Sequence, residues 1–256
     1  MVVMKFGGTS VGKPERMHQV SQLITRSDEP TIVVLSALSG TTNALVEISA
    51  ALASSNKQNA AEKIAILEKQ YRSFIIDLLK EEALREKANK IISEHFEFLY
   101  ITQKISLSDA LNKDILAQGE LMSTKLFSCY LEQQNIEHAL LPALEFMQLD
   151  VNDEPDLIAI QTKIKDVLAP HLGKKLFITQ GYICRNSKGE VDNLKRGGSD
   201  YTASLIAAAV KASVCEIWTD IDGMHNNDPR VVEKTVAIEQ LSFDEAAELA
   251  YFGAKI

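Results

Sequence analysis

Apolar and polar positions near the start of the chain alternate between strand-like and helix-like patterns. Residues 2–6 are a short apolar run that ends at two glycines, and residues 31–35 form a β-branched run. Residues 14–25 and 41–53 instead place apolar side chains three and four positions apart, the spacing of one helix face. The order strand, helix, strand, helix with short links predicts a parallel sheet covered by helices on both faces.

The middle of the chain has a different pattern, because residues 57–104 contain neither glycine nor proline. Their apolar side chains recur at steps of three and four, which predicts two charged amphipathic helices that lie over another element. We expect a helical insertion around residues 57–107 that is an ordinary cover, although a lid or regulatory insertion would give the same pattern. The positions that carry the pattern are Ile64, Leu67, Tyr71, Phe74, Leu78, Leu84, Ala88, Ile91, His95 and Phe98.

Alternating strand and helix signals then resume. They predict helices over residues 109–134, 155–168, 201–212 and 243–252, and strands over residues 137–141, 175–182 and 214–219. The sequence NSKG at residues 186–189, between two extended segments, predicts a β-hairpin. The predicted fold class is therefore α/β, a three-layer αβα sandwich with a mainly parallel central sheet.

Composition narrows the class of protein. A chain of 256 residues with 46% hydrophobic and 24% charged residues has the composition of a folded globular protein, and its length fits one large domain or two small ones. No apolar run approaches the roughly 18 residues that span a bilayer, and residues 1–5 are too short for a signal peptide. The net charge of −8 would repel nucleic-acid phosphates. We therefore expect neither a membrane nor a nucleic-acid partner.

The cysteines indicate the compartment. Cys129, Cys184 and Cys215 are an odd number without a CxxC pair, which favours a reducing, cytoplasmic setting over a disulfide or zinc framework.

A glycine-rich turn follows the first predicted strand, in the sequence KFGGTSVG that begins at Lys5. Glycines let backbone N–H groups approach an anion, and the start of the next helix adds positive potential. Residues 7–13 nearly match a P-loop, but Pro14 stands where a P-loop needs a magnesium-binding Ser or Thr, so we reject that match. Lys5, on the strand before the turn, is the lysine expected to point over the glycines.

A second pair of glycines precedes a later helix, in the sequence RGGSD that begins at Arg196. Arg196 can bind a carboxylate or phosphate through two parallel hydrogen bonds. Ser199 is a candidate N-cap, and Asp200 suits the positive end of a helix. Two anion sites that face each other would suit phosphoryl transfer between two substrates.

Polar residues follow two other predicted strands at their carboxyl ends, where parallel sheets bind ligands. In SALSGTTN, residues 36–43, the hydroxyls could bind a ligand or, more commonly, cap a helix. WTDIDG at residues 218–223 is either an acidic loop or part of a site. Glu120 follows a glycine inside a helical stretch, where a lone glutamate is usually a solvated surface residue.

Together these blocks resemble aspartokinase, in the amino acid kinase family, and occur in family order over almost the whole chain. The combination of KFGGTS, RGGSD and WTDIDG is highly specific. The blocks EIWTDIDG and ELAYFGAK look most like the kinase half of bifunctional aspartokinase–homoserine dehydrogenases. The matching stretches are KFGGTSVG at Lys5, VVLSALSGTTN at Val33, QGEL at Gln118, TQGY at Thr179, KRGGSDYTASLIAA at Lys195, EIWTDIDG at Glu216, DPR at Asp228 and ELAYFGAK at Glu248.

The resemblance implies the amino acid kinase fold and ATP-dependent phosphorylation of the β-carboxylate of L-aspartate to 4-phospho-L-aspartate. This reaction is the first step of lysine, threonine and methionine biosynthesis. The β-carboxylate is ionised at neutral pH, because its reference pKa is about 3.9. No general base is then needed, and catalysis rests on positioning and charge neutralisation.

The resemblance also implies roles for residues. Lys5, Asp200 and Lys255 would be catalytic, with magnesium carried by ATP and Asp200 near it. The family often has an aromatic residue, commonly Tyr, at the position of His225. ATP would be bound by Lys5, Gly7, Gly8, Ser10, Gly198, Ser199, Thr219, Asp220, His225 and Arg230. Aspartate would be bound by Ser36, Thr42, Glu120 and Arg196, with Thr42 and Arg196 at its α-carboxylate and Glu120 at its ammonium group.

Family members continue past the FGAK motif into small regulatory ACT domains, and some into a homoserine dehydrogenase domain. Residues 1–256 are therefore expected to be a catalytic domain truncated at its C-terminal end, from a full-length protein that forms a homo-oligomer. Two alternatives stay open: a related carboxylate or carbamate kinase of the same fold, and an inactive nucleotide-binding fragment.

Overall fold

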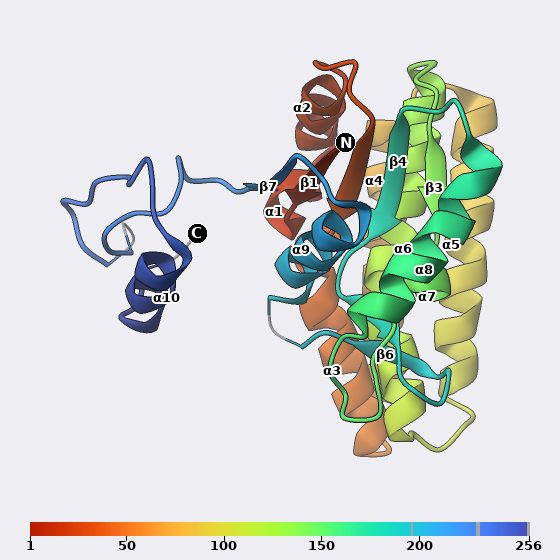
Figure 1. Cartoon of the computed structure of the whole chain (residues 1–256). Helices are drawn as coiled ribbons and strands as arrows, with labels where there is room; N and C mark the ends of the chain where they lie inside the picture. Colours follow the sequence, from red (N-terminus) through yellow and green to blue (C-terminus); the bar gives the residue numbers. More distant parts are fainter. Residues whose placement is uncertain (196, 229–230, 255–256) are drawn as a thin grey trace. The chain divides into compact units, whose positions relative to one another are not determined.

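The computed structural model describes residues 1–195, 197–228 and 231–254. It divides the chain into two units, Met1–Trp218 and Thr219–Ile256, which we describe separately. The five-stranded sheet of the first unit has the order β3-β4-β2-β1-β7, and every neighbouring pair is parallel (Figure 1). Its strands are β1 (Val2–Phe6), β2 (Thr31–Leu35), β3 (Ala139–Leu141), β4 (Leu176–Gln180) and β7 (Val214–Trp218).

Alternate side chains of the strands enter two separate hydrophobic cores. Val33 and Leu35 of β2 belong to one core, whereas Ile32 and Val34 belong to the other, because successive strand residues point to opposite faces. Helices cover both faces (Figure 1), which confirms the three-layer αβα sandwich. The first core is covered by α2 (Pro14–Ile24), α3 (Thr41–Ala53) and α6 (Asp109–Gln133), and the second by α7 (Ala143–Phe146), α8 (Leu157–Leu168) and α9 (Gly198–Val210).

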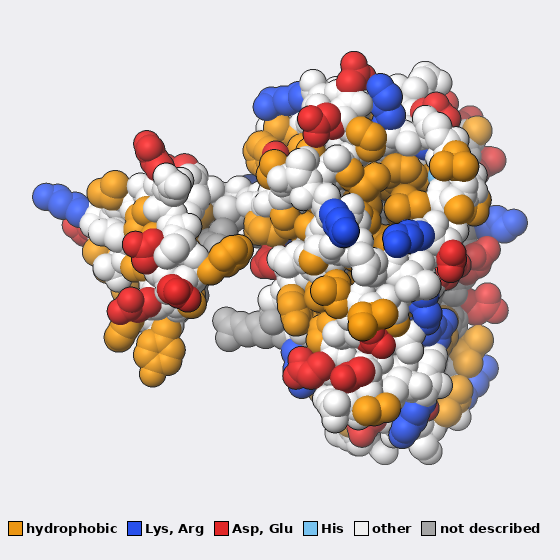
Figure 2. Space-filling view, in the orientation of Figure 1, with side chains coloured by type: hydrophobic (Ala, Val, Ile, Leu, Met, Phe, Trp, Pro, Cys, Tyr) orange, Lys and Arg blue, Asp and Glu red, His pale blue; other side chains and the backbone are white. Residues whose placement is uncertain are grey.

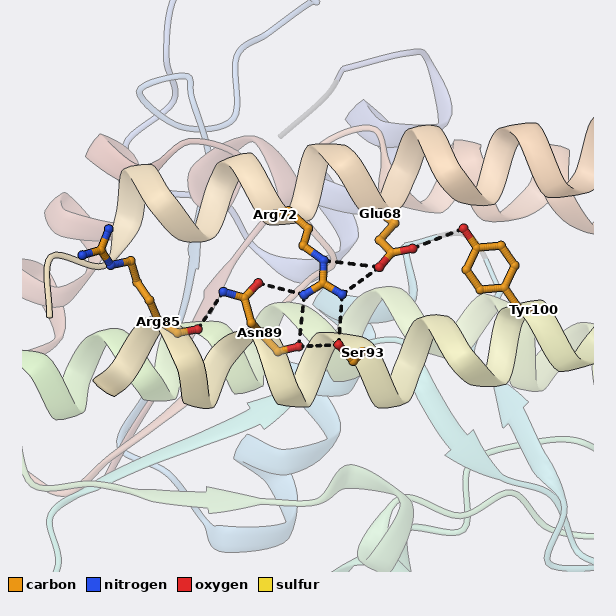
Figure 3. Close-up of polar contacts among 6 residues, drawn as sticks. All are labelled: Glu68, Arg72, Arg85, Asn89, Ser93 and Tyr100. Atoms are coloured by element: carbon orange, nitrogen blue, oxygen red, sulfur yellow. Dashed lines mark hydrogen bonds and ion pairs between the residues drawn. The ribbon is translucent and has the colours of Figure 1, made fainter. Parts of the chain in front are cut away.

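The two helices predicted in the middle of the chain are α4 (Lys57–Leu78) and α5 (Glu82–Thr102). They pack on each other and on α3 and α6, so they form an outer helical cover on one side of the sheet. Arg72 of α4 joins the pair, because its guanidinium donates hydrogen bonds to Glu68 within α4 and to Asn89 and Ser93 of α5 (Figure 3). Tyr100 of α5 donates to the other carboxylate oxygen of Glu68 at 3.2 Å.

Shorter elements complete the first unit. The predicted hairpin is β5 (Ile183–Arg185) paired antiparallel with β6 (Val191–Asn193). The other two are α1 (Gly8–Val11), which begins in the glycine-rich turn, and a 3-10 helix at Ala169–His171. Charged side chains of both signs are interspersed on the face shown in Figure 2. None of the described helices has the length and apolar character that crossing a membrane requires.

The second unit contains α10 (Phe243–Tyr251). This helix begins at a capping box, in which Ser242 and Glu245 each bind the backbone N–H of the other residue, the arrangement that satisfies two free donors at a helix start. An isolated antiparallel bridge between His225 and Ala237 closes the preceding loop.

Candidate functional site

A pocket of about 630 Å³ lies at the carboxyl ends of the central strands. Its walls come from the turn after β1, the segment after β2, the middle of α6 and the start of α9. These segments are far apart in sequence, and the parallel order of β4, β2 and β1 brings their ends to one edge of the sheet. The sequence-predicted site residues that line the pocket are Lys5, Gly8, Ser36, Thr42, Glu120, Gly198, Ser199 and Asp200.

One side of the pocket carries an ion pair. The Lys5 ammonium group at the end of β1 lies 2.7 Å from the Asp200 carboxylate, and 12% of the Lys5 side chain is exposed. Asp200 sits in the first turn of α9, where a negative charge is favoured. The pair places a cation and a helix N-terminus together, which is suitable for binding phosphate.

The glycine-rich turn packs closely against the segment after β2. A Cβ on Gly8 would lie 2.9 Å from the Ala37 carbonyl oxygen, and a Cβ on Gly12 would lie 2.6 Å from the Ser39 Cβ. Gly7 is the N-cap of α1 and accepts a hydrogen bond from the Ser10 N–H. Glycine is thus needed here for a close approach of two backbones.

The start of α9 corrects one prediction. Its N-cap is Gly197, which has a φ of 74° in the left-handed region, and not Ser199. Glycine adopts this conformation without the cost that a Cβ brings, so the backbone sets the helix start. The Ser199 hydroxyl instead accepts a hydrogen bond from the Ser36 hydroxyl at 2.9 Å, which links the ends of β2 and α9.

The part of the pocket wall that comes from α6 carries a buried carboxylate. Glu120 of α6 is only 3% exposed, so the expectation of a solvated glutamate was wrong. Its Oε1 accepts a hydrogen bond from the Ala37 N–H at 3.2 Å, whereas its buried Oε2 has no hydrogen-bond partner among the described residues. Burial raises the pKa of Glu120 to about 7. A buried acceptor without a donor is costly, and an ammonium group would remove that cost.

Close packing explains how α6 brings Glu120 to the pocket. A Cβ on Gly119 would lie 2.8 Å from the Ala37 Cβ, so only glycine lets the helix approach the segment after β2 this closely. Ser123, one turn further, donates a hydrogen bond to the Ser36 carbonyl oxygen at 2.8 Å. Gln180 at the end of β4 donates to the Thr124 hydroxyl at 2.8 Å. The helix is therefore fixed to both β2 and β4 beside the pocket.

Tyr182 also lines the pocket, although we did not single it out from the sequence. Its backbone has a φ of 67°, which is unusual for a bulky residue and typical of functional sites. Its N–H donates to the Thr202 hydroxyl, which in turn donates to the Gly198 carbonyl oxygen. Burial and the negative charges of Glu120 and Asp192 raise the pKa of Tyr182 to about 12. The only signal in the sequence was the aromatic residue that ends the TQGY block.

The contacts of the remaining predicted residues do not test their predicted role in nucleotide binding. In the second unit, the Thr219 hydroxyl donates to Asp220 at 3.3 Å. His225 uses both ring nitrogens there, with Asp222 at 2.6 Å and Thr235 at 2.8 Å. The predictions for Arg196, Arg230 and Lys255 fall outside the described residues.

The buried Glu120 carboxyl predicts a specific dependence of stability on pH. Its pKa is about 7 in the folded protein and near its ordinary value of 4.5 when unfolded, so between these values the folded state holds the extra proton. The ligand-free protein should thus lose roughly 3 kcal/mol of unfolding free energy as pH rises from about 4.5 to 7. Glu120→Gln removes the ionisation and therefore this loss. The unfolding free energy of the variant minus that of the parent should thus be larger above pH 7 than at pH 5. Urea unfolding at both pH values measures this, and a variant-to-parent difference that does not change with pH would contradict it.

Comparison with known proteins identifies the family. The amino acid kinase family matches residues 1–256. The chain is 36% identical to the lysine-sensitive aspartokinase 3 of Escherichia coli, covering 100% of this chain and 57% of that protein. It is 35% identical to the bifunctional aspartokinase/homoserine dehydrogenase of Haemophilus influenzae, covering 100% of this chain and 32% of that protein.

Solved structures show the same similarity. The E. coli aspartokinase III structure in complex with aspartate and ADP (R-state) superposes with a TM-score of 0.86 at 34% identity, covering 99% of this chain and 57% of that one. The chain thus spans between about a third and just over half of the length of these relatives. The resemblance to aspartokinases is therefore confirmed. The chain belongs to the amino acid kinase family.

Proposed function

We propose that this protein transfers the γ-phosphoryl group of ATP to the β-carboxylate of L-aspartate, forming 4-phospho-L-aspartate and ADP. The observation that carries the proposal is one pocket with a phosphate-type side and an ammonium-type side, formed by Lys5 and by Glu120. It is supported by the similarity to an aspartokinase whose structure holds aspartate and ADP.

On the phosphate side, Lys5 would bind the phosphates of ATP. The glycine-rich turn and the start of α9 would add backbone N–H groups, with Gly198 and Ser199 beside the transferred group. Such fixed donors stabilise the charge that develops in phosphoryl transfer. Asp200 would hold the Lys5 ammonium group in place before ATP binds, because the two are already paired at 2.7 Å.

On the acceptor side, Glu120 would bind the ammonium group of aspartate through its free Oε2. Thr42, which lines the pocket, and Arg196 would bind the α-carboxylate, and Ser36 would lie beside them. This leaves the β-carboxylate as the nucleophile. It needs no proton removed, so the contribution of the residues is orientation of the two reacting groups.

Magnesium fits this arrangement as an ion brought by ATP. The described residues contain no group of three or more His, Cys, Asp or Glu side chains that could hold a metal ion. Magnesium usually keeps several waters and binds substrate phosphates plus one or two carboxylates, and Asp200 would be that carboxylate. The ion supplies further neutralisation of phosphate charge when bound.

We also propose that the full-length protein is a cytoplasmic homo-oligomer and that regulatory ACT domains follow the catalytic domain. These proposals rest on the family resemblance. Light scattering on the full-length protein tests the oligomeric state.

A comparison of acceptors tests the proposed reaction. The full-length protein should release ADP from magnesium-ATP with L-aspartate and far less with L-glutamate, because the longer side chain moves its carboxylate away from the transfer point when its α-groups are held. Release with N-acetyl-L-glutamate or carbamate and not with aspartate would instead indicate a related kinase of the same family. Calorimetric binding of a non-hydrolysable ATP analogue without any turnover would indicate an inactive nucleotide-binding protein.

A further inference from the structure

Tyr71 of α4 joins the outer helical cover to the start of α3, beside the substrate pocket. Tyr71 is 2% exposed, and its ring packs edge to face against Phe96 of α5 with centroids 5.9 Å apart. Its hydroxyl lies 3.1 Å from the Thr41 hydroxyl, in a buried hydrogen bond. A phenylalanine would satisfy the packing alone, so the hydroxyl group has a separate role.

Thr41 connects that hydroxyl to the acceptor side of the pocket. It is the first residue of α3 and directly precedes Thr42, which lines the pocket. Its Cγ2 lies 3.3 Å from the position that a Cβ on Gly119 would occupy, so it also packs against the residue before Glu120. A shift of Thr41 would therefore disturb both Thr42 and Glu120.

The segment that Tyr71 holds has open space on both sides. Ser39, Gly40 and Asn43 line the substrate pocket and also a second cavity of about 470 Å³ between α3 and α4, in whose wall Tyr71 lies. Gly40 has a φ of 84° and nothing within 4 Å of the position where a Cβ would be. Packing therefore does not hold the turn at Gly40, although Ser39 packs against Gly12 and Thr41 is buried, so the hydrogen bond between Tyr71 and Thr41 adds a fixed contact directly after Gly40.

Tyr71 stays a neutral hydroxyl throughout. Burial raises its pKa well above the usual range, the hydrogen bond with Thr41 lowers it, and the negative charge of Glu120 raises it. The phenol is therefore neutral near pH 7 and keeps its hydrogen for the bond with Thr41.

We propose that Tyr71 is a positioning residue for acceptor binding, which holds the start of α3 through Thr41 and so makes the helical insertion part of the substrate site. The proposal rests on the proposed function for its substrate. It predicts that removing the Tyr71 hydroxyl affects the acceptor and not ATP.

The test is Tyr71→Phe, with Tyr100→Phe as the matched control. Both changes remove one hydroxyl from a tyrosine of the same helix pair, but Tyr100 bonds to Glu68 away from the substrate pocket. Tyr71→Phe should raise the KM for L-aspartate about three- to tenfold, the effect of one lost hydrogen bond, and change the KM for ATP less than about twofold. Thr41→Val should have the same effect, and the double variant no more than either alone, because the two act as one unit.

Hydrogen exchange separates this proposal from the proposed function. Amides of residues 38–43 should exchange faster in Tyr71→Phe than in Tyr100→Phe, whether or not the protein phosphorylates aspartate. Equal exchange in the two variants, equal increases in both KM values, or additive effects of Tyr71→Phe and Thr41→Val would overturn it. If the parent protein neither binds nor phosphorylates aspartate, the proposed function fails, and hydrogen exchange alone decides the positioning role.

Discussion

Replacing Lys5 with methionine is expected to lower the rate of phosphoryl transfer about 10²- to 10³-fold, the usual cost of losing one group that stabilises transition-state charge. The change removes the cation that lies 2.7 Å from Asp200 at the end of β1. It also leaves Asp200 without its cationic partner, so the carboxylate proposed to bind magnesium is no longer held in place. Both consequences slow phosphoryl transfer.

Steady-state kinetics with saturating aspartate measures this effect. The control is Lys13→Met, at the exposed N-cap of α2, which removes an equal charge from the end of the same turn. The Lys5 side chain is 12% exposed and the Asp200 side chain 49% exposed, so circular dichroism is used to check that the variant folds. A folded Lys5→Met variant that retains the parent rate would remove Lys5 from the site.

Replacing Glu120 with glutamine should weaken aspartate binding about 10²- to 10³-fold, since removing one partner of a buried ion pair costs roughly 3–5 kcal/mol. Glutamine can keep the hydrogen bond from the Ala37 N–H through its carbonyl oxygen. Its amide NH₂ would then occupy the position of the free Oε2 and face the substrate ammonium group, donor against donor. Binding of ATP should change little, because the proposed ATP contacts come from Lys5, the glycine-rich turn and the start of α9, and not from Glu120.

Calorimetric titration with L-aspartate and the KM values for both substrates test this second prediction. Glu132→Gln is the matched control, because it changes the same residue type on the same helix, where Glu132 pairs with Lys87 at the surface. Such surface pairs contribute little. If Glu120→Gln binds aspartate as tightly as Glu132→Gln does, the ammonium-binding role of Glu120 is wrong.

The hydrophobic pattern predicted best the elements that bury a continuous face. The all-buried β2 and the regular apolar positions of α4 are examples. The strands predicted over residues 2–6 and 31–35 match the structure, whereas the later strands are shorter than predicted. The strand predicted over residues 175–182, for example, extends only from Leu176 to Gln180. At its carboxyl end the chain turns at Gly181, where a Cβ would lie 2.5 Å from the Ser199 hydroxyl oxygen.

The site was harder to predict, because its decisive contacts join residues far apart in sequence. Ser36 and Ser199 are 163 positions apart, and nothing local to Ser199 distinguishes such a contact from a helix cap. The burial of Glu120 depends on the glycine before it and on the approach of Ala37. For Glu120, only the family resemblance pointed to the site, whereas the usual exposure of a lone glutamate in a helix favoured the solvated surface.

Tyr71 illustrates the remaining difficulty. The apolar repeat placed its ring correctly in the core of the helical cover, but a repeat of hydrophobic positions carries no information about the hydroxyl group at the end of the ring. Its partner, Thr41, lies on another helix 30 residues earlier. The link between the insertion and the site therefore becomes visible only in three dimensions.

The most direct test of the central claim is to trap the product. The full-length protein is incubated with magnesium-ATP, L-aspartate and hydroxylamine, which converts an acyl phosphate into a stable hydroxamate, and mass spectrometry identifies the carboxyl group that has reacted. We predict the β-hydroxamate of aspartate, formed by the parent protein and strongly reduced in Lys5→Met and in Glu120→Gln at low aspartate. An α-hydroxamate would contradict the proposed site. So would β-hydroxamate formed by both variants in the same amount as by the parent protein.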